Sequence, residues 1–141
     1  MITKKAATLI RRCFFYYLAK RAKNLYNRRM TKLVKNIEKL IALLQDGNSW
    51  CREGAAQKLS GERCEYDDTD AAKWCLLGGS MKLFGLASVE YFEVYNFLRH
   101  QVGQVTISHF NDTSKHKDIM KFLQNCLDVA KNPAQAKAKA A

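Results

Sequence analysis

Apolar residues in the first third of the chain recur at steps of three and four. The series is Ile2, Ala6, Leu9, Ile10, Cys13, Phe14, Tyr17, Leu18, Leu25, Tyr26, Met30, Leu33, Ile37, Leu40, Ile41 and Leu44. Such steps place residues on one face of an α-helix. The pattern predicts one helix of about 40 residues, some 60 Å long, or a helix broken near Asn24 or Asn27, where propensity is weaker. Thr3 is the expected N-cap and Gly47 the expected stop.

The middle of the chain mixes short apolar runs with glycine and acidic residues. It predicts a short helix over 53–59, followed by an acidic loop. A longer helix is expected over 71–84, with Thr69 or Asp70 as its cap and Gly85 as its stop.

The last third predicts two further helices. The first begins after the capping residue Ser88 and ends near Gly103. The segment 105–110 alternates loosely between apolar and polar residues, and we expect it to be extended. The final helix runs through Ala130. Its candidate caps are Asp112, Thr113 and Ser114.

These elements together predict an all-α protein, a small helical bundle with a long basic N-terminal helix. The single proline, Pro133, favours uninterrupted helices. We divide the chain into a basic helical arm over 1–35, a helical core domain over 36–131 and a flexible tail over 132–141, which is rich in alanine and lysine.

The net charge of the protein resides in its N-terminal region. Residues 1–40 contain twelve lysines and arginines and one acid, Glu38, so they carry the whole formal charge of +11, whereas the remainder is neutral. Helices normally balance such charges with acids at four-residue spacing. The asymmetry indicates a polyanionic partner, most simply nucleic acid. An acidic protein or a second copy of the chain is the alternative, and a membrane surface is the less favoured one.

The candidate nucleic-acid contacts lie along this arm. They are Arg11, Arg12, Lys20, Arg21, Lys23, Arg28, Arg29, Lys32, Lys35, Tyr16 and Tyr17. Cations bind phosphates, and aromatic rings stack on unpaired bases. Phe14, Phe15 and Tyr26 add to the aromatic content. Four consecutive aromatic residues at 14–17 point around the helix, so no single core buries all of them.

Two copies of a WCxxG motif begin at Trp50 and Trp74, and Phe110-Asn111-Asp112 follows. With these features the segment 36–130 resembles a family of small uncharacterised helical proteins of bacteria and their phages. The resemblance implies a compact helical domain and no particular activity. Gly79 and Phe110 stand where that family usually has alanine and tryptophan.

We interpret the second motif mainly as packing. On a helix over 71–84, Trp74 and Gly78 share a face, and the missing Cβ of Gly78 permits close approach of a neighbour. Cys75 is then a buried thiol inside the helix, away from its N-terminus. The alternative is a cysteine hydrolase with Cys75 as nucleophile, His109 as base, and Asn111 or Asp112 as the residue that orients it.

No cofactor or metal is predicted. Cys51, Cys64, Cys75 and His109 are possible zinc donors, but they lack the paired spacing of zinc sites. The odd number of cysteines favours a reducing, cytoplasmic setting. A mitochondrial matrix location is the alternative, because the N-terminus is basic and free of acids through Ile37. The overall prediction is a non-enzymatic module that binds nucleic acid, alone or within a ribonucleoprotein or phage assembly.

Overall fold

The computed structural model of the protein describes residues 4–135. The expected N-cap Thr3 and the end of the expected flexible tail, 136–141, lie outside the described residues. The chain forms two compact units, Met1–Lys32 and Leu33–Ala141. The prediction of a mainly helical protein with a long N-terminal helix is confirmed. A small sheet that the sequence pattern did not predict accompanies the helices.

Helix α1 runs unbroken from Lys4 to Leu44, over 41 residues, so the predicted single long helix is confirmed and the alternative of a break near Asn24 or Asn27 is wrong. The good helix formers around Asn27 outweigh its weak propensity, because helix formation is cooperative. The helix ends before Gly47. At its C-terminus the carbonyl of Leu44 accepts a hydrogen bond from His116 Nε2 at 2.7 Å, which satisfies one of the last helical carbonyls. A single 3₁₀ turn, η1 (Gly47–Ser49), follows.

The small sheet has three strands, β1 (Ala56–Lys58), β2 (Arg63–Cys64) and β3 (Ala71–Trp74), in the order β2-β1-β3. Both pairings are antiparallel, with Ala56 opposite Cys64 on one side and Trp74 on the other. The predicted helix over 53–59 is therefore wrong, and so is the first turn of the helix predicted over 71–84. Short strands of this kind depend on pairing with a neighbouring strand, which overrides weak local preference.

Four helices follow the sheet: α2 (Leu76–Phe84), α3 (Val89–Val102), α4 (Ile107–Thr113) and α5 (His116–Lys131). The predicted cap Ser88 and the predicted stops Gly85 and Gly103 are confirmed. The segment predicted as extended instead forms α4, because the Thr106 hydroxyl caps its first turn. Lys115, rather than one of the three predicted caps, precedes α5, and its backbone N–H donates to Asp118.

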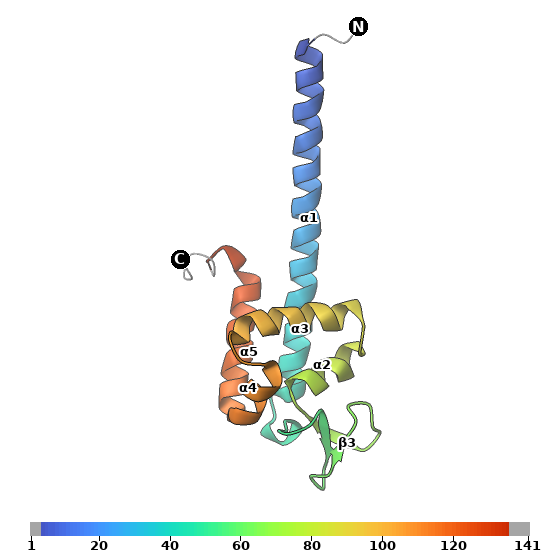
Figure 1. Cartoon of the computed structure of the whole chain (residues 1–141), viewed down its shortest axis with the longest axis vertical. Helices are drawn as coiled ribbons and strands as arrows, with labels where there is room; N and C mark the ends of the chain where they lie inside the picture. The colour runs from blue at the N-terminus through green and yellow to red at the C-terminus, as the bar shows by residue number, and fades with distance from the viewer. Residues whose placement is uncertain (1–3, 136–141) are drawn as a thin grey trace. The chain divides into compact units, whose positions relative to one another are not determined.

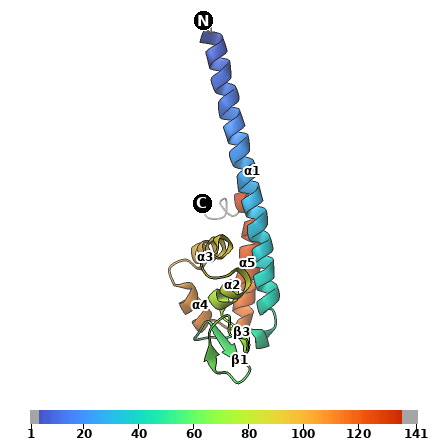
Figure 2. The same ribbon diagram turned by 90° about the vertical axis from the view of Figure 1, so that its right-hand side faces the viewer.

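The core of the second unit is apolar and draws on every one of its longer helices. Its fully buried side chains include Ile37, Leu40 and Leu44 of α1, Leu76 of α2, Val94 and Leu98 of α3, and Ile119, Leu123 and Cys126 of α5. Figures 1 and 2 both show α5 alongside the last turns of α1. An ion pair between Lys131 and Glu38, 3.2 Å apart, joins these two helices at the surface.

The two WCxxG motifs meet at the edge of the sheet. Trp50 and Trp74 form a parallel bridge, and Trp74 is buried with its indole N–H donating to the carbonyl of Tyr66 at 3.0 Å. Trp74 lies in β3, so it does not share a helix face with Gly78 as the sequence pattern predicted. Gly78 instead allows a backbone to approach: a Cβ there would lie 1.8 Å from the carbonyl oxygen of Ala55.

Candidate nucleic-acid interface

The basic arm, defined here as residues 4–32 of α1, is helical because its residues favour helices. Alanine, leucine, lysine and arginine dominate it, and it contains neither proline nor glycine. Every side chain from Thr8 to Arg29 is exposed. Helical geometry therefore presents the whole sequence of this stretch on the surface of one element.

Aromatic rings of the arm are exposed to an unusual degree. Phe14, Phe15, Tyr16 and Tyr17 are each between 59% and 71% exposed. Large aromatic side chains bury well over half of their surface in most proteins. The observation agrees with the prediction that four consecutive rings cannot face a single core.

Positive charge surrounds the arm without acidic neighbours. No acid occurs before Glu38, and within the described range six of the predicted contacts form no ion pair. These six are Arg11, Arg12, Lys20, Arg21, Lys23 and Arg28. Arg29 and Lys32 have interactions of their own, and Lys35 is an exposed residue of the second unit. The arm thus holds a dense field of cations available to phosphate groups.

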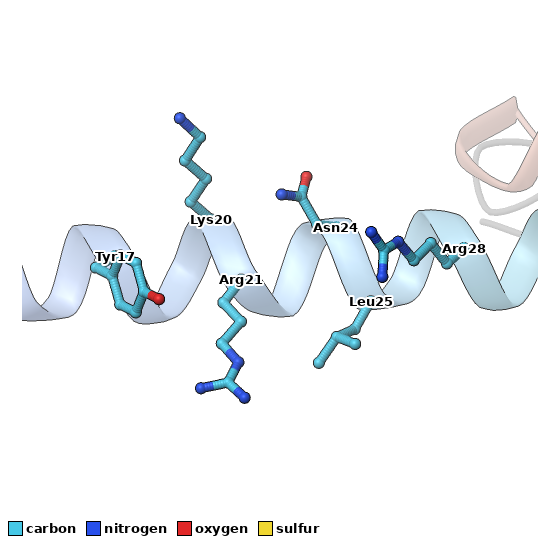
Figure 3. A pocket seen from close by; sticks show the side chains of 6 residues that line it. All are labelled: Tyr17, Lys20, Arg21, Asn24, Leu25 and Arg28. Carbon is cyan, nitrogen blue, oxygen red and sulfur yellow. The ribbon is translucent and has the colours of Figure 1, made fainter.

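Two surface hollows lie along the arm. The Tyr17 hollow is lined by Tyr17, Lys20, Arg21, Asn24, Leu25 and Arg28. Figure 3 shows Lys20 and Asn24 on one side of the helix and Arg21 and Leu25 on the other, with Tyr17 and Arg28 at the two ends. The Tyr16 hollow is lined by Tyr16, Ala19, Lys20, Lys23, Asn24 and Asn27. Lys20 and Asn24 border both.

The structure thus brings most of the predicted contacts of the arm together. The two tyrosines and Lys20, Arg21, Lys23 and Arg28 line the hollows, whereas Arg11 and Arg12 lie one to two turns before them. Sequence reasoning missed Asn24 and Asn27 as lining residues, because they were considered only as positions of low helix propensity where the helix could break. The available signal was their spacing: Asn24 is seven residues after Tyr17, and Asn27 is eleven after Tyr16, which are both helical repeats.

The alternative cysteine site has a different character. Cys75 is the N-cap of α2, and its Sγ accepts a hydrogen bond from the Gly78 N–H at 3.2 Å. The prediction that Cys75 lies inside its helix is therefore wrong. Cys75 is nonetheless buried, and this burial raises the pKa of its thiol despite the backbone N–H groups that favour the thiolate.

Asn111 is the centre of a structural hydrogen-bond cluster. Its side-chain oxygen accepts from Trp50 Nε1 at 2.9 Å and from the Leu76 N–H at 3.2 Å. Its amide nitrogen donates to the Cys51 carbonyl and to Asp112, both at 3.1 Å. With its amide fully engaged and 1% exposed, Asn111 ties α4 to the first WCxxG segment and to the start of α2.

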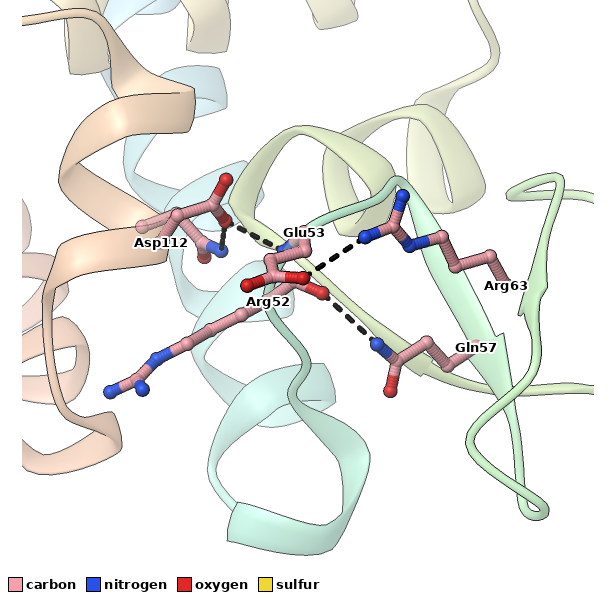
Figure 4. Close-up of polar contacts among 6 residues, drawn as sticks. Arg52, Glu53, Gln57, Arg63 and Asp112 are labelled. Carbon is pink, nitrogen blue, oxygen red and sulfur yellow. Dashed lines mark hydrogen bonds and ion pairs between the residues drawn. The ribbon is translucent and has the colours of Figure 1, made fainter.

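Asp112 continues the same cluster toward the surface. Its carboxylate accepts from the Glu53 N–H at 2.9 Å, which holds Glu53 at a φ of 58°. Figure 4 shows this contact beside the ion pair of Glu53 with Arg63, 3.0 Å apart. Arg52 donates to the Ser114 carbonyl and lies over the Trp50 ring. These contacts stabilise the loop that contains Arg52 and Glu53, in which Glu53 has a positive φ.

In the described part of the chain no hydrogen bond links His109 to Cys75, Asn111 or Asp112, the other residues of the predicted hydrolase. Among the described residues, His109 makes hydrogen bonds only through its backbone, to Thr106 and Thr113, and its side chain is exposed. Asn111 and Asp112 are engaged in the cluster above. No group of three or more cysteine, histidine or acidic side chains within residues 4–135 is arranged to hold a metal ion.

The difference in burial among the cysteines predicts a large difference in the rates at which their thiols react. Burial raises the pKa of Cys126 to about 12, whereas Cys13 is exposed on the arm. Because the thiolate is the reactive form, we expect iodoacetamide near pH 8 to modify Cys13 at least about 100-fold faster than Cys126 or Cys75. Mass spectrometry of the native protein over time measures these rates. Modification of Cys75 as rapid as that of Cys13 would contradict the packing role and restore the hydrolase hypothesis.

Neither the arm nor any other helix in the described part of the chain combines the length and apolar character that crossing a membrane requires. Comparisons with models of protein families, with curated proteins and with solved structures each found no match for this chain.

Proposed function

We propose that the protein binds nucleic acid through the basic arm and acts as a non-enzymatic binding module, alone or within a ribonucleoprotein or phage assembly. The observation that supports this most is the complete exposure, from Thr8 to Arg29, of a stretch that combines cations with aromatic rings and contains no acid. A long series of cations neutralises phosphates and releases their counterions, which is the main source of affinity for nucleic acid.

The distribution of charge favours a nucleic acid over a membrane surface. Helices that lie in a membrane interface separate an apolar face from a cationic one. In the arm, cations occur on every face: Arg12 shares a face with Tyr16, and Arg21 shares one with Leu25. A polyanion that contacts the arm from several sides satisfies such an arrangement better than a flat bilayer does.

A protein partner is the second candidate, supported by the exposed apolar residues Leu9, Ile10, Leu18 and Leu25. A second copy of the chain would bring two equally charged arms together, which opposes self-association at low salt. An acidic protein would neutralise the arm as a nucleic acid does. In either case we place the protein in the cytoplasm, where its odd number of cysteines remains reduced.

The dependence of binding on salt tests the proposal with the full chain. If six arm cations each contact one phosphate of a single strand, the slope of log affinity against log salt is about −4. We expect at least that slope for a fluorescent oligonucleotide, measured by anisotropy from about 50 to about 200 mM salt. Polyglutamate of similar charge is the control. Absence of oligonucleotide binding at low salt, or tighter binding of polyglutamate, would contradict the proposal.

A further inference from the structure

We infer that the basic arm binds unpaired nucleotides, and that the Tyr16 and Tyr17 hollows each hold one base on a tyrosine ring. The inference rests on the proposed function and specifies its ligand: a single-stranded stretch of RNA or DNA. An unpaired nucleotide offers an exposed aromatic face, a phosphate and a base edge with hydrogen-bond donors and acceptors. Each hollow contains a side chain suited to each of these three groups.

The Tyr17 hollow combines them along three helical turns. The Tyr17 ring, 61% exposed, is at one end and Arg28 at the other. Lys20 and Arg21 extend to either side of the hollow in this view, and the Asn24 amide lies between its ends. If a base stacks on Tyr17, Lys20 and Arg21 can each contact one of the two phosphates that flank it. The Asn24 amide, in the same hollow, can form a hydrogen bond with the edge of the base.

The Tyr16 hollow repeats the arrangement on the adjoining face. Tyr16 is 71% exposed, Lys20 and Lys23 supply cations, and Asn24 and Asn27 supply amides. Lys20 and Asn24 border both hollows, so one phosphate on Lys20 suits the link between two successive nucleotides. Neither Lys20 nor Lys23 forms an ion pair within the described part of the chain, so neither has to break an ion pair to contact a phosphate.

Unpaired bases fit this surface better than a duplex does. In a double helix the faces of the bases are stacked on one another, so only the ends of the duplex offer a face to a tyrosine. The major groove of duplex RNA is too deep and narrow for side chains to reach its bases. The exposed rings of Tyr16 and Tyr17 would contribute little to contact with a duplex backbone, whereas stacking is a main source of affinity for single strands.

The test compares two double variants of the full chain. Tyr16→Leu with Tyr17→Leu removes both stacking rings and keeps charge and helix propensity. Phe15→Leu with Tyr26→Leu is the matched control, because it removes two exposed rings of the same arm that line neither hollow. The probes are oligo(U), oligo(dT) and the corresponding duplexes, of about 20 nucleotides, which exceeds the usual site size for single strands.

We expect the natural chain to prefer both single strands over their duplexes at equal salt. The tyrosine variant should bind single strands at least about 20-fold more weakly, the combined effect of two lost stacking contacts. It should keep the salt slope, since its cations are unchanged. The control should lose less than about 3-fold, because its two rings lie outside the hollows. A stronger effect on oligo(U) than on oligo(dT) would identify RNA as the preferred strand.

Two results would overturn the inference while leaving the proposed function intact. One is equal affinity for duplex and single strand in the natural chain, and the other is an equal loss in the two double variants. Failure of the natural chain to bind any of these probes at low salt would overturn both the inference and the proposed function.

Discussion

Reversal of four arginines in the basic arm to glutamate is expected to abolish the binding of nucleic acid. The residues are Arg11, Arg12, Arg21 and Arg28, all exposed and without ion pairs among the described residues. Each reversal removes a phosphate contact and adds a repulsive charge. We expect an affinity at least about 100-fold lower, and a salt slope reduced by about 3, which is four contacts at about 0.7 each on a single strand.

A control with the same change of charge separates the arm from the total charge. Glutamate at Lys39, Arg99, Lys117 and Lys121, four exposed cations of the second unit, also lowers the net charge of +11 by eight. We expect this control to keep most of the affinity, and both variants to keep their helical circular dichroism because glutamate favours helices. Equal losses in the two variants would show that charge alone, without the arm, determines binding.

The helical elements were predictable where local chemistry defines them. Ser88 caps α3 with its hydroxyl, and Gly85 and Gly103 end α2 and α3 with positive φ. These signals depend on one residue and its immediate neighbours. The length of α1 was predictable for a similar reason, because the apolar steps of three and four persist through Leu44.

The sheet was not predictable, because each of its short strands is extended through pairing with another segment and not through its own local preference. The sequence AAKW at 71–74 favours a helix as readily as a strand, and only pairing with Ala56 and its neighbours makes it extended. The same pairing moves Cys75 from a helix interior to an N-cap, where its Sγ accepts the Gly78 N–H. The role of Asn111 as the centre of a hydrogen-bond cluster was not predictable. Its partners Trp50, Cys51 and Leu76 are far from it in the sequence, so only the folded chain brings them together.

The arm illustrates the opposite situation. Its cations and the exposure of its rings follow from the sequence of one helix, so composition and the helical repeat predicted both. The hollows were not predicted, because they depend on how neighbouring side chains of the helix are placed around Asn24 and Asn27, where the sequence also allowed a break. Low propensity at two positions was outweighed by the good helix formers around them, and the cooperativity of helix formation extends the helix across such positions.

Gly78→Ala is expected to destabilise the second unit by about 3 kcal/mol or more, at the upper end of the usual cost of overpacking. The added Cβ would lie 1.8 Å from the Ala55 carbonyl oxygen and 2.6 Å from its carbon. Backbone atoms cannot rotate aside as a flexible side chain does, so α2 must move away from Ala55. That movement weakens the bond of the Cys75 N–H to the same carbonyl, 3.2 Å long, at the N-terminus of α2.

The neighbouring glycine supplies the control. A Cβ at Gly79 would meet only side chains, Leu40 Cδ1 at 3.1 Å and Leu43 Cδ2 at 3.3 Å. Replacing glycine by alanine inside a helix raises the stability of the helix by up to about 1 kcal/mol. This gain offsets the cost of the tighter contact. We therefore expect Gly79→Ala to change stability by less than about 1 kcal/mol.

Urea unfolding followed by tryptophan fluorescence measures both variants. A Gly78→Ala protein as stable as the natural one would refute the close approach of Ala55. Marked destabilisation of both variants would instead show that this turn of α2 accepts no added methyl group at either glycine.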